Sequence, residues 1–126
     1  MLDLMGGFNV LFTFWPFMYL VGGFLLGLFF GAIPGLTATL AIALLLPFTF
    51  SMEVGNALIM VMGIYMAGIY AGSITGITLN IPGAPSGAIT SLDGHALMKK
   101  GRGAQALSLD AFASSIGGMI GALVLM

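Results

Sequence analysis

The sequence contains little charge and no cysteine. Charged residues make up 6% of the 126 residues and hydrophobic residues 60%, whereas soluble proteins carry roughly 25% charged residues. So few charged side chains cannot cover a surface exposed to water, and so hydrophobic a chain is not disordered. The composition therefore predicts a membrane protein with several spans, or a part of one.

The missing residue types also exclude several kinds of site. Without cysteine the chain has no disulfide, no thiolate nucleophile and no cysteine-based zinc site, and its single histidine excludes a multi-histidine metal site. No basic tract is present to bind nucleic acid. No nucleotide-binding glycine loop, pair of catalytic carboxylates or Ser/His/Asp set occurs at a usable spacing. We therefore expect no metal site, no cofactor, no nucleic-acid partner and no enzymatic activity.

Charged residues divide the chain into apolar segments. None occurs from Leu4 to Met52 or from Val54 to Leu92, and about 20 apolar residues cross a hydrocarbon core of roughly 30 Å. Prolines and glycines set the breaks between helices. We expect an all-α, polytopic transmembrane protein with broken or re-entrant segments at its Pro-Gly loops. The expected helices are residues 15–33, residues 36–50 (short or re-entrant), residues 54–79 and residues 104–126.

The apolar stretch after Asp110 runs to Met126 without a polar cap, which is unusual for the end of a membrane protein. We therefore expect residues 1–126 to be the N-terminal part of a larger transmembrane domain. Three basic residues, Lys99, Lys100 and Arg102, favour a cytoplasmic position for the segment that carries them. The N-terminus then lies outside if residues 36–50 cross the membrane and inside if they are re-entrant, and the sequence leaves both arrangements open.

Several glycines recur at every fourth position. Such a spacing keeps them on one face of a helix and leaves a groove that a neighbouring backbone can enter closely. We interpret the pattern as tight helix packing. The alternative is a smooth face along which one group of helices slides during transport. The glycines concerned are Gly23, Gly27, Gly31 and Gly35, then Gly68, Gly72 and Gly76, and finally Gly117 and Gly121.

Two segments, residues 31–39 and 78–90, combine proline, glycine and small hydroxyl residues at the expected depth of the membrane. Proline removes a backbone donor and glycine permits open conformations, so both segments are expected to leave the helix. Unpaired backbone in hydrocarbon is tolerated only where protein or a water-filled cavity receives it. Many secondary transporters bind an anion at such unwound segments. The alternative is a pair of simple helix breaks whose hydroxyl groups bond to the local backbone.

Hydroxyl residues in both segments are candidates for helix caps. Thr37 or Thr39 is expected to cap the short helix that follows Pro34-Gly35, and Ser86 a turn that follows Pro85. The free N–H groups and hydroxyl groups at these positions would offer neutral coordination for a carboxylate.

The charged cluster of residues 93–102 is expected to form a loop near the membrane boundary. Asp93 and His95 are candidates for proton coupling, because histidine titrates near neutral pH; the alternative is a solvated loop histidine. Acidic residues inside a membrane are functional candidates by default, so Asp110 is either such a residue or an interfacial one.

These segments resemble, in order, the signatures of one family, the large membrane subunit of the tripartite tricarboxylate transporters (the TctA family). The resemblance covers most of the chain, from about residue 20 to residue 121. It departs from the family in length and at Ala96, where the family commonly has a proline. The matching segments are Gly31-Ala-Ile-Pro-Gly-Leu-Thr-Ala-Thr39, Leu44-Leu-Leu-Pro-Phe48, Gly68-Ile-Tyr-Ala-Gly-Ser-Ile-Thr75, Asn80-Ile-Pro-Gly-Ala-Pro85, Leu92-Asp-Gly-His95, Lys100-Gly-Arg102 and Ala106-Leu107.

The resemblance implies a multi-pass permease of the bacterial inner membrane. In this family a large subunit works with a small membrane subunit and a periplasmic solute-binding protein to import citrate or related carboxylates, coupled to Na⁺ or H⁺. The chain is then the N-terminal part of one transporter domain. Asp93 and His95 remain the candidates for coupling. The residues that we expect to contact substrate or ion are Pro34, Gly35, Thr37, Thr39, Asn80, Pro82, Gly83 and Ser86.

A second function remains open: an accessory membrane subunit that transports nothing and docks the helices of a partner through its glycine faces. The two functions differ in whether the Pro-Gly segments bind a ligand.

Overall fold

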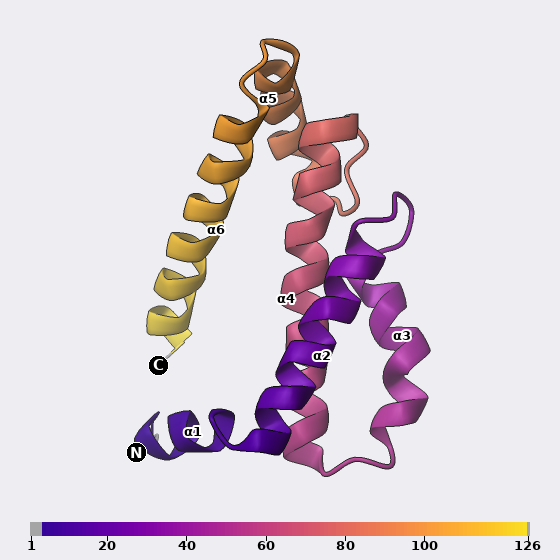
Figure 1. Ribbon diagram of the computed structural model, residues 1–126, viewed down its shortest axis with the longest axis vertical. Coiled ribbons are helices and arrows are strands. Elements are labelled where there is room, and N and C mark those ends of the chain that lie inside the picture. Colours follow the sequence, from indigo (N-terminus) through magenta and orange to yellow (C-terminus); the bar gives the residue numbers. More distant parts are fainter. Residues whose placement is uncertain (1–3, 126) are drawn as a thin grey trace.

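The computed structural model describes residues 4–125, and all regular secondary structure in this range is helical (Figure 1). The prediction of an all-α protein is confirmed. The helices are α1 (Leu4–Leu11), α2 (Phe14–Gly31), α3 (Ala38–Thr49), α4 (Val54–Leu79), α5 (Gly87–Lys99) and α6 (Gly103–Leu125).

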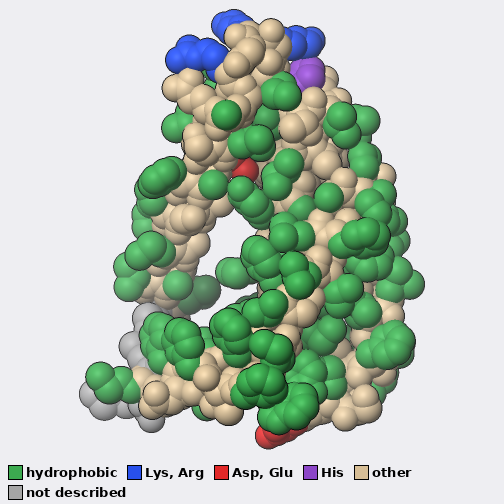
Figure 2. Space-filling model, in the orientation of Figure 1, with side chains coloured by type: hydrophobic (Ala, Val, Ile, Leu, Met, Phe, Trp, Pro, Cys, Tyr) green, Lys and Arg blue, Asp and Glu red, His purple; other side chains and the backbone are tan. Residues whose placement is uncertain are grey.

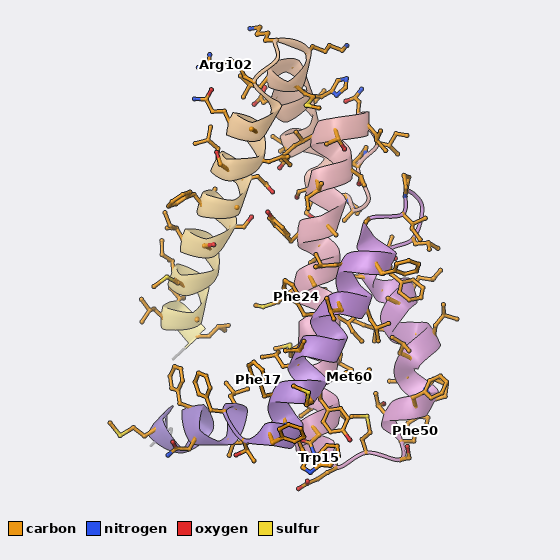
Figure 3. All side chains as sticks on the ribbon, viewed as in Figure 1. Trp15, Phe17, Phe24, Phe50, Met60 and Arg102 are labelled. Carbon is orange, nitrogen blue, oxygen red and sulfur yellow. The ribbon has the colours of Figure 1, made fainter. Side chains whose placement is uncertain are left out.

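Three of these helices, α2, α4 and α6, are long and apolar enough to cross a membrane. With 12 residues, α3 is about 18 Å long and too short for a crossing by itself. The sequence-based ranges for α2, α3 and α6 differ from these bounds by one or two residues at each end, and Met126, the expected end of the last helix, lies outside the described residues. Many large apolar side chains point outward, among them Phe17, Phe24 and Phe50 (Figure 3), as expected of a surface that faces lipid.

Two helices, α1 and α5, were not predicted. The charged cluster of residues 93–102 was expected to be a loop, but residues 93–99 belong to α5 and only Lys100, Gly101 and Arg102 connect α5 to α6. The reason is tertiary packing. Three small residues at helical spacing, Gly87, Ser91 and Gly94, are buried, and they let α5 lie against α4 while its charged residues, Asp93 and Lys99, stay exposed.

The contact between α2 and α4 is made backbone to backbone. A Cβ atom added to Gly23, Gly27 or Gly31 would overlap the carbonyl oxygen of Met60, Ile64 or Gly68, respectively. Each pair lies one helical turn beyond the previous one in both helices, so α2 and α4 run parallel. The packing interpretation is confirmed for these glycines, whereas a Cβ atom added to Gly117 or Gly121 on α6 would meet nothing within 4 Å.

Helices α2 and α3 form a hairpin, so α3 ends at the same end of the molecule at which α2 begins. In Figure 1, α2 rises beside α4 and α3 descends to the loop that leads into α4. The N-terminal end of α4 carries Glu53, and the basic residues gather at the opposite end of the molecule, near Arg102 (Figures 2 and 3). Trp15, at the start of α2, lies at the Glu53 end, stacked on Tyr19 with ring centroids 6.4 Å apart.

The glycine contact provides a matched pair of substitutions. We expect Gly23→Ala to destabilise the protein by about 1–3 kcal/mol, the usual cost of overpacking, because its methyl group would meet the carbonyl oxygen of Met60. Gly22→Ala is the control, since a Cβ atom at Gly22 meets nothing within 4 Å. Thermal unfolding of the purified protein in detergent measures both, and equal melting temperatures would contradict the backbone contact.

Candidate functional site

The first Pro-Gly break lies between α2 and α3. Gly35 has a φ of 91°, a left-handed conformation that a residue with a Cβ atom rarely adopts. The hydroxyl oxygen of Thr37 accepts a hydrogen bond from the N–H of Leu40 at 3.2 Å, which caps α3 as predicted. Thr39 lies within α3 and is exposed, so it is no part of the break. Pro34 and Gly35 are exposed as well.

The second break folds back along α4. Asn80 ends α4 in the left-handed conformation, with φ 58° and ψ 29°. The chain then returns toward the middle of α4, where the N–H of Gly83 donates to the carbonyl oxygen of Gly72 at 3.4 Å. From there α5 runs parallel to α4, because Gly87 lies beside Gly72 and Gly94 beside Ile77.

The predicted cap at Ser86 is wrong. Ser86 occupies the N-cap position of α5 but makes no side-chain cap hydrogen bond. Its φ of −63° and ψ of −27° are helical, whereas a capping residue normally has an extended backbone that turns its oxygen toward the free N–H groups. Ser86, Asn80 and Pro82 are all exposed on the outer side of the second break.

The second break meets α4 and the last residue of α2, where the first break begins. A Cβ atom added to Gly83 would lie 2.8 Å from the Cα of Gly72, 3.2 Å from the carbonyl oxygen of Gly31 and 3.6 Å from the hydroxyl oxygen of Thr75. The carbonyl oxygen of Gly72 also accepts a hydrogen bond from that hydroxyl, at 3.0 Å. We call these four residues (Gly31, Gly72, Thr75 and Gly83) the Gly72 junction, and all four are buried.

The Gly72 junction lies well inside the length of α4. Gly72 is seven residues before the end of this helix at Leu79, or about 10 Å at 1.5 Å per residue. Both short helices begin beside the same part of α4, since Gly68 contacts Ala38 at the start of α3 and Gly72 lies near Gly87 at the start of α5. They run in opposite directions from there (Figure 1), so the positive ends of both helix dipoles lie near Gly68 and Gly72.

The breaks leave backbone donors without partners. The N–H of Gly35 in the first break and the N–H of Ala84 in the second have no hydrogen-bond partner among residues 4–125. Together with the first N–H groups of α3 and α5, which have no acceptor within their own helices, these donors suit an anion.

The predicted contact residues differ in their burial. Gly83 is buried and Thr37 is half-buried, whereas the other six lie at the surface of the breaks or on α3.

The two predicted coupling residues lie on α5 and not on a loop. His95 is half-buried, and its Nδ1 lies 3.0 Å from the carbonyl oxygen of Ile77. A carbonyl oxygen can only accept, so the histidine donates an N–H from Nδ1 and satisfies a carbonyl in the last turn of α4. Asp93 is exposed. The hydrogen bond gives His95 a role in holding α5 against α4.

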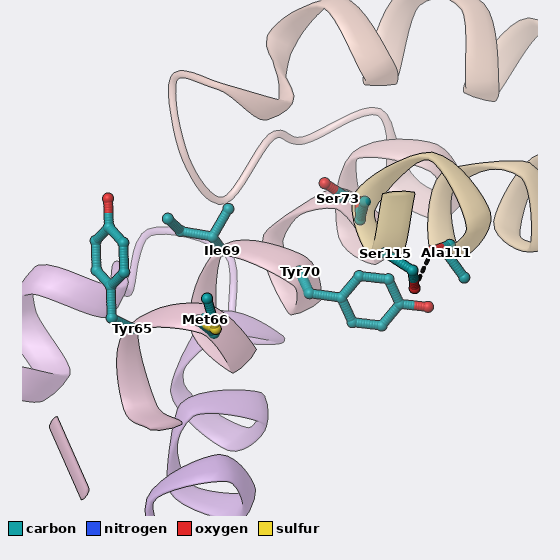
Figure 4. A pocket seen from close by; sticks show the side chains of 8 residues that line it. Tyr65, Met66, Ile69, Tyr70, Ser73, Ala111 and Ser115 are labelled. Atoms are coloured by element: carbon teal, nitrogen blue, oxygen red, sulfur yellow. Dashed lines mark hydrogen bonds between the residues drawn. The ribbon is translucent and has the colours of Figure 1, made fainter. Parts of the chain in front are cut away.

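A pocket of about 450 Å³ lies between α4 and α6 (Figure 4). It was missed from the sequence, although Tyr70 and Ser73 share one face of α4 by their spacing and are followed far along the chain by the pair Ser114-Ser115. Tyr70 extends toward Ser115 on α6 (Figure 4), whose hydroxyl donates to the carbonyl oxygen of Ala111 at 2.8 Å. The pocket thus has an apolar wall with a few hydroxyl groups.

The hydrogen bond of His95 predicts the tautomer of its ring. We expect the neutral histidine to carry its proton on Nδ1, because this nitrogen donates to Ile77. Since the chain has one histidine, its ¹⁵N NMR signals need no assignment by mutation. A neutral ring protonated on Nε2 would contradict the contact. We also expect His95→Ala to cost about 1 kcal/mol of stability, the usual net value of one hydrogen bond.

Comparison with known proteins agrees with the signatures in the sequence. Residues 17–126 match the family model "Tripartite tricarboxylate transporter TctA family". The chain is also similar to a protein of Agrobacterium vitis described as "Uncharacterized 52.8 kDa protein in TAR-I ttuC' 3'region", with 44% identity over 103 residues, which is 82% of this chain and 20% of that protein. The chain therefore spans about a fifth of the length of this relative. No solved structure matches the chain. By the extent of the family match, the chain belongs to the tripartite tricarboxylate transporter TctA family.

Proposed function

We propose that this chain forms part of the permease that imports citrate-like or other small carboxylates in a tripartite tricarboxylate transporter. A periplasmic binding protein delivers the substrate, a small membrane subunit completes the permease, and a gradient of Na⁺ or H⁺ drives uptake. Membership of the family implies a membrane component of such a system. The observation that carries the rest is the Gly72 junction, where the second break and the end of α2 meet α4 beside the starts of both short helices.

The junction suits a carboxylate for an electrostatic reason. Two helix N-termini carry partial positive charge toward Gly68 and Gly72. The unpaired N–H of Ala84 follows Gly83 in the second break, and the unpaired N–H of Gly35 lies in the exposed first break. Such dipoles hold an anion without burying a fixed positive charge, which costs far more in an apolar environment. Half-length helices and unwound backbone serve the same purpose in other secondary transporters.

The distribution of charge supports one orientation in the bacterial inner membrane. The basic residues around Arg102 and the start of α2 lie at opposite ends of the molecule (Figures 1 and 3). Under the positive-inside rule the basic end is cytoplasmic, and the start of α2 then faces the periplasm. Of the two arrangements left open by the sequence, this is the one in which the N-terminus lies outside.

The accessory-subunit alternative depends on free glycine faces. Gly23, Gly27 and Gly31 of α2 are already covered by α4, so they offer no surface to a partner. Gly117 and Gly121 of α6 have open space around them. In the accessory-subunit alternative, these two glycines are the surface available to a partner helix. A transport assay separates the two functions.

Substitutions at the junction test the proposal. We expect Gly83→Leu to lower uptake of labelled citrate by about tenfold, equivalent to about 1.4 kcal/mol, because the new side chain would push the second break away from Gly72 and from the end of α2. Gly35→Leu should act in the same direction, since its φ of 91° strains any side chain. Uptake is measured in cells that express the permease with its partner subunits, at matched levels of permease in the membrane.

Gly22→Leu is the control, because Gly22 lies on α2 with nothing within 4 Å of an added Cβ atom. Normal uptake in both the Gly35 and Gly83 variants would remove the two breaks from the mechanism. Absence of carboxylate uptake in the unsubstituted system would favour the accessory subunit.

A further inference from the structure

Asp110 is the single charged residue of α6, a helix long and apolar enough to cross a membrane. It lies seven residues after the start of the helix at Gly103, or about 10 Å into it. Its carboxylate oxygen Oδ2 is buried and has no hydrogen-bond partner among residues 4–125. An acidic side chain in such a place is expensive and calls for a function.

The side chain lines a pocket of about 340 Å³ between α4, α5 and α6. Ile77 of α4 and Leu97 of α5 contribute apolar walls, and Thr90 and Asp93 of α5 supply the other polar side chains. Figure 2 shows an acidic side chain at the upper edge of the hollow between α6 and the rest of the molecule. This pocket is separate from the Gly72 junction, which contains no acidic residue.

The charges around the pocket all have one sign. Asp93 on α5 and Asp110 on α6 are its titratable residues, and α4 contributes none. Lys99, Lys100 and Arg102 do not line it, and the Nδ1 of His95 is directed to the carbonyl oxygen of Ile77. With no cation to pair with, and with a second carboxylate in the same pocket, Asp110 is most stable when it is neutral.

A proton neutralises this carboxylate better than a metal ion does. In secondary transporters Na⁺ is coordinated by carbonyl oxygens of unwound backbone. The lining residues of this pocket lie within helices, where carbonyl oxygens accept helical hydrogen bonds. In the last turns, the carbonyl oxygen of Ile77 accepts from His95 and that of Leu97 accepts from the N–H groups of Lys100 and Arg102. Within residues 4–125, no three His, Cys, Asp or Glu side chains come together to hold a metal ion. A proton needs one oxygen, and Oδ2 of Asp110 is free to receive it.

We propose that Asp110 is the proton-binding carboxyl of this transporter, and that the driving proton occupies it during transport. The proton leaves water on one side of the membrane, binds to Oδ2 and is later released to water on the other side. Asp93, an exposed residue that lines the same pocket, is the route of exchange with water. The coupling role depends on the proposed transport function, whereas the protonated state of Asp110 does not.

The protonated state is tested by infrared spectroscopy of the whole permease in lipid bilayers. We expect a carbonyl stretch of a protonated carboxylic acid at neutral pH, lost in Asp110→Asn and retained in Glu53→Gln, which removes an acidic residue at the opposite end of α4. A band that persists in Asp110→Asn, or no such band in the unsubstituted protein, would overturn the proposal. Loss of the band on addition of Na⁺ at constant pH would show a cation in place of the proton and would overturn it too.

The coupling role is tested in proteoliposomes. We expect Asp110→Asn to abolish accumulation of substrate driven by a pH gradient, while exchange of labelled for unlabelled substrate continues, because exchange needs no net movement of protons. Loss of both activities with the infrared band of the unsubstituted protein in place would assign Asp110 to substrate binding and overturn the coupling role. If the unsubstituted permease transports no carboxylate, the proposed function fails while the infrared result for Asp110 stands.

Discussion

The close contact between α2 and α4 is the constraint on which the rest of the structure depends. Lipid provides no hydrophobic drive for helices to associate, so close packing of backbones must do so. The glycines of α2 let it lie against α4 with no side chain between them. This brings Gly31, the last residue of α2, beside Gly68 and close to Gly72. The second break and the start of α3 can then reach neighbouring turns of α4, and the candidate site is a consequence of this approach.

Much of this arrangement was predictable because the signals are strong and local. Uninterrupted apolar runs identified the long helices, Pro34 and Pro82 identified the breaks, and Thr37 was one of the two candidate caps. The sequence did not predict α5, because Asp93, His95 and Lys99 were read as signs of a loop. Their helical conformation is imposed by packing against α4, which a local pattern does not contain. For the same reason the missing cap at Ser86 could not be predicted, since it depends on backbone angles fixed by the second break.

The convergence of the breaks could not be read from the sequence either. Gly31 and Gly83 are far apart along the chain, and they meet only because the second break folds back along α4 to Gly72. The pocket around Asp110 likewise depends on the angle at which α6 descends from α5. The carboxylate itself was identified as a candidate from its position in an apolar segment, but its neighbours come from three different helices.

The opposite directions of α3 and α5 have an electrostatic consequence for the two breaks. Two like partial charges are held near Gly68 and Gly72 by helices that point away from each other, so in the absence of an anion they repel across a medium of low polarity. Under the proposed function, a bound carboxylate would remove that repulsion and draw the two short helices together. Occupancy would then favour a compact arrangement of the two breaks, and departure of the substrate a looser one. The polarity of the backbone itself would thus favour the alternation between open and occluded forms that a carrier needs.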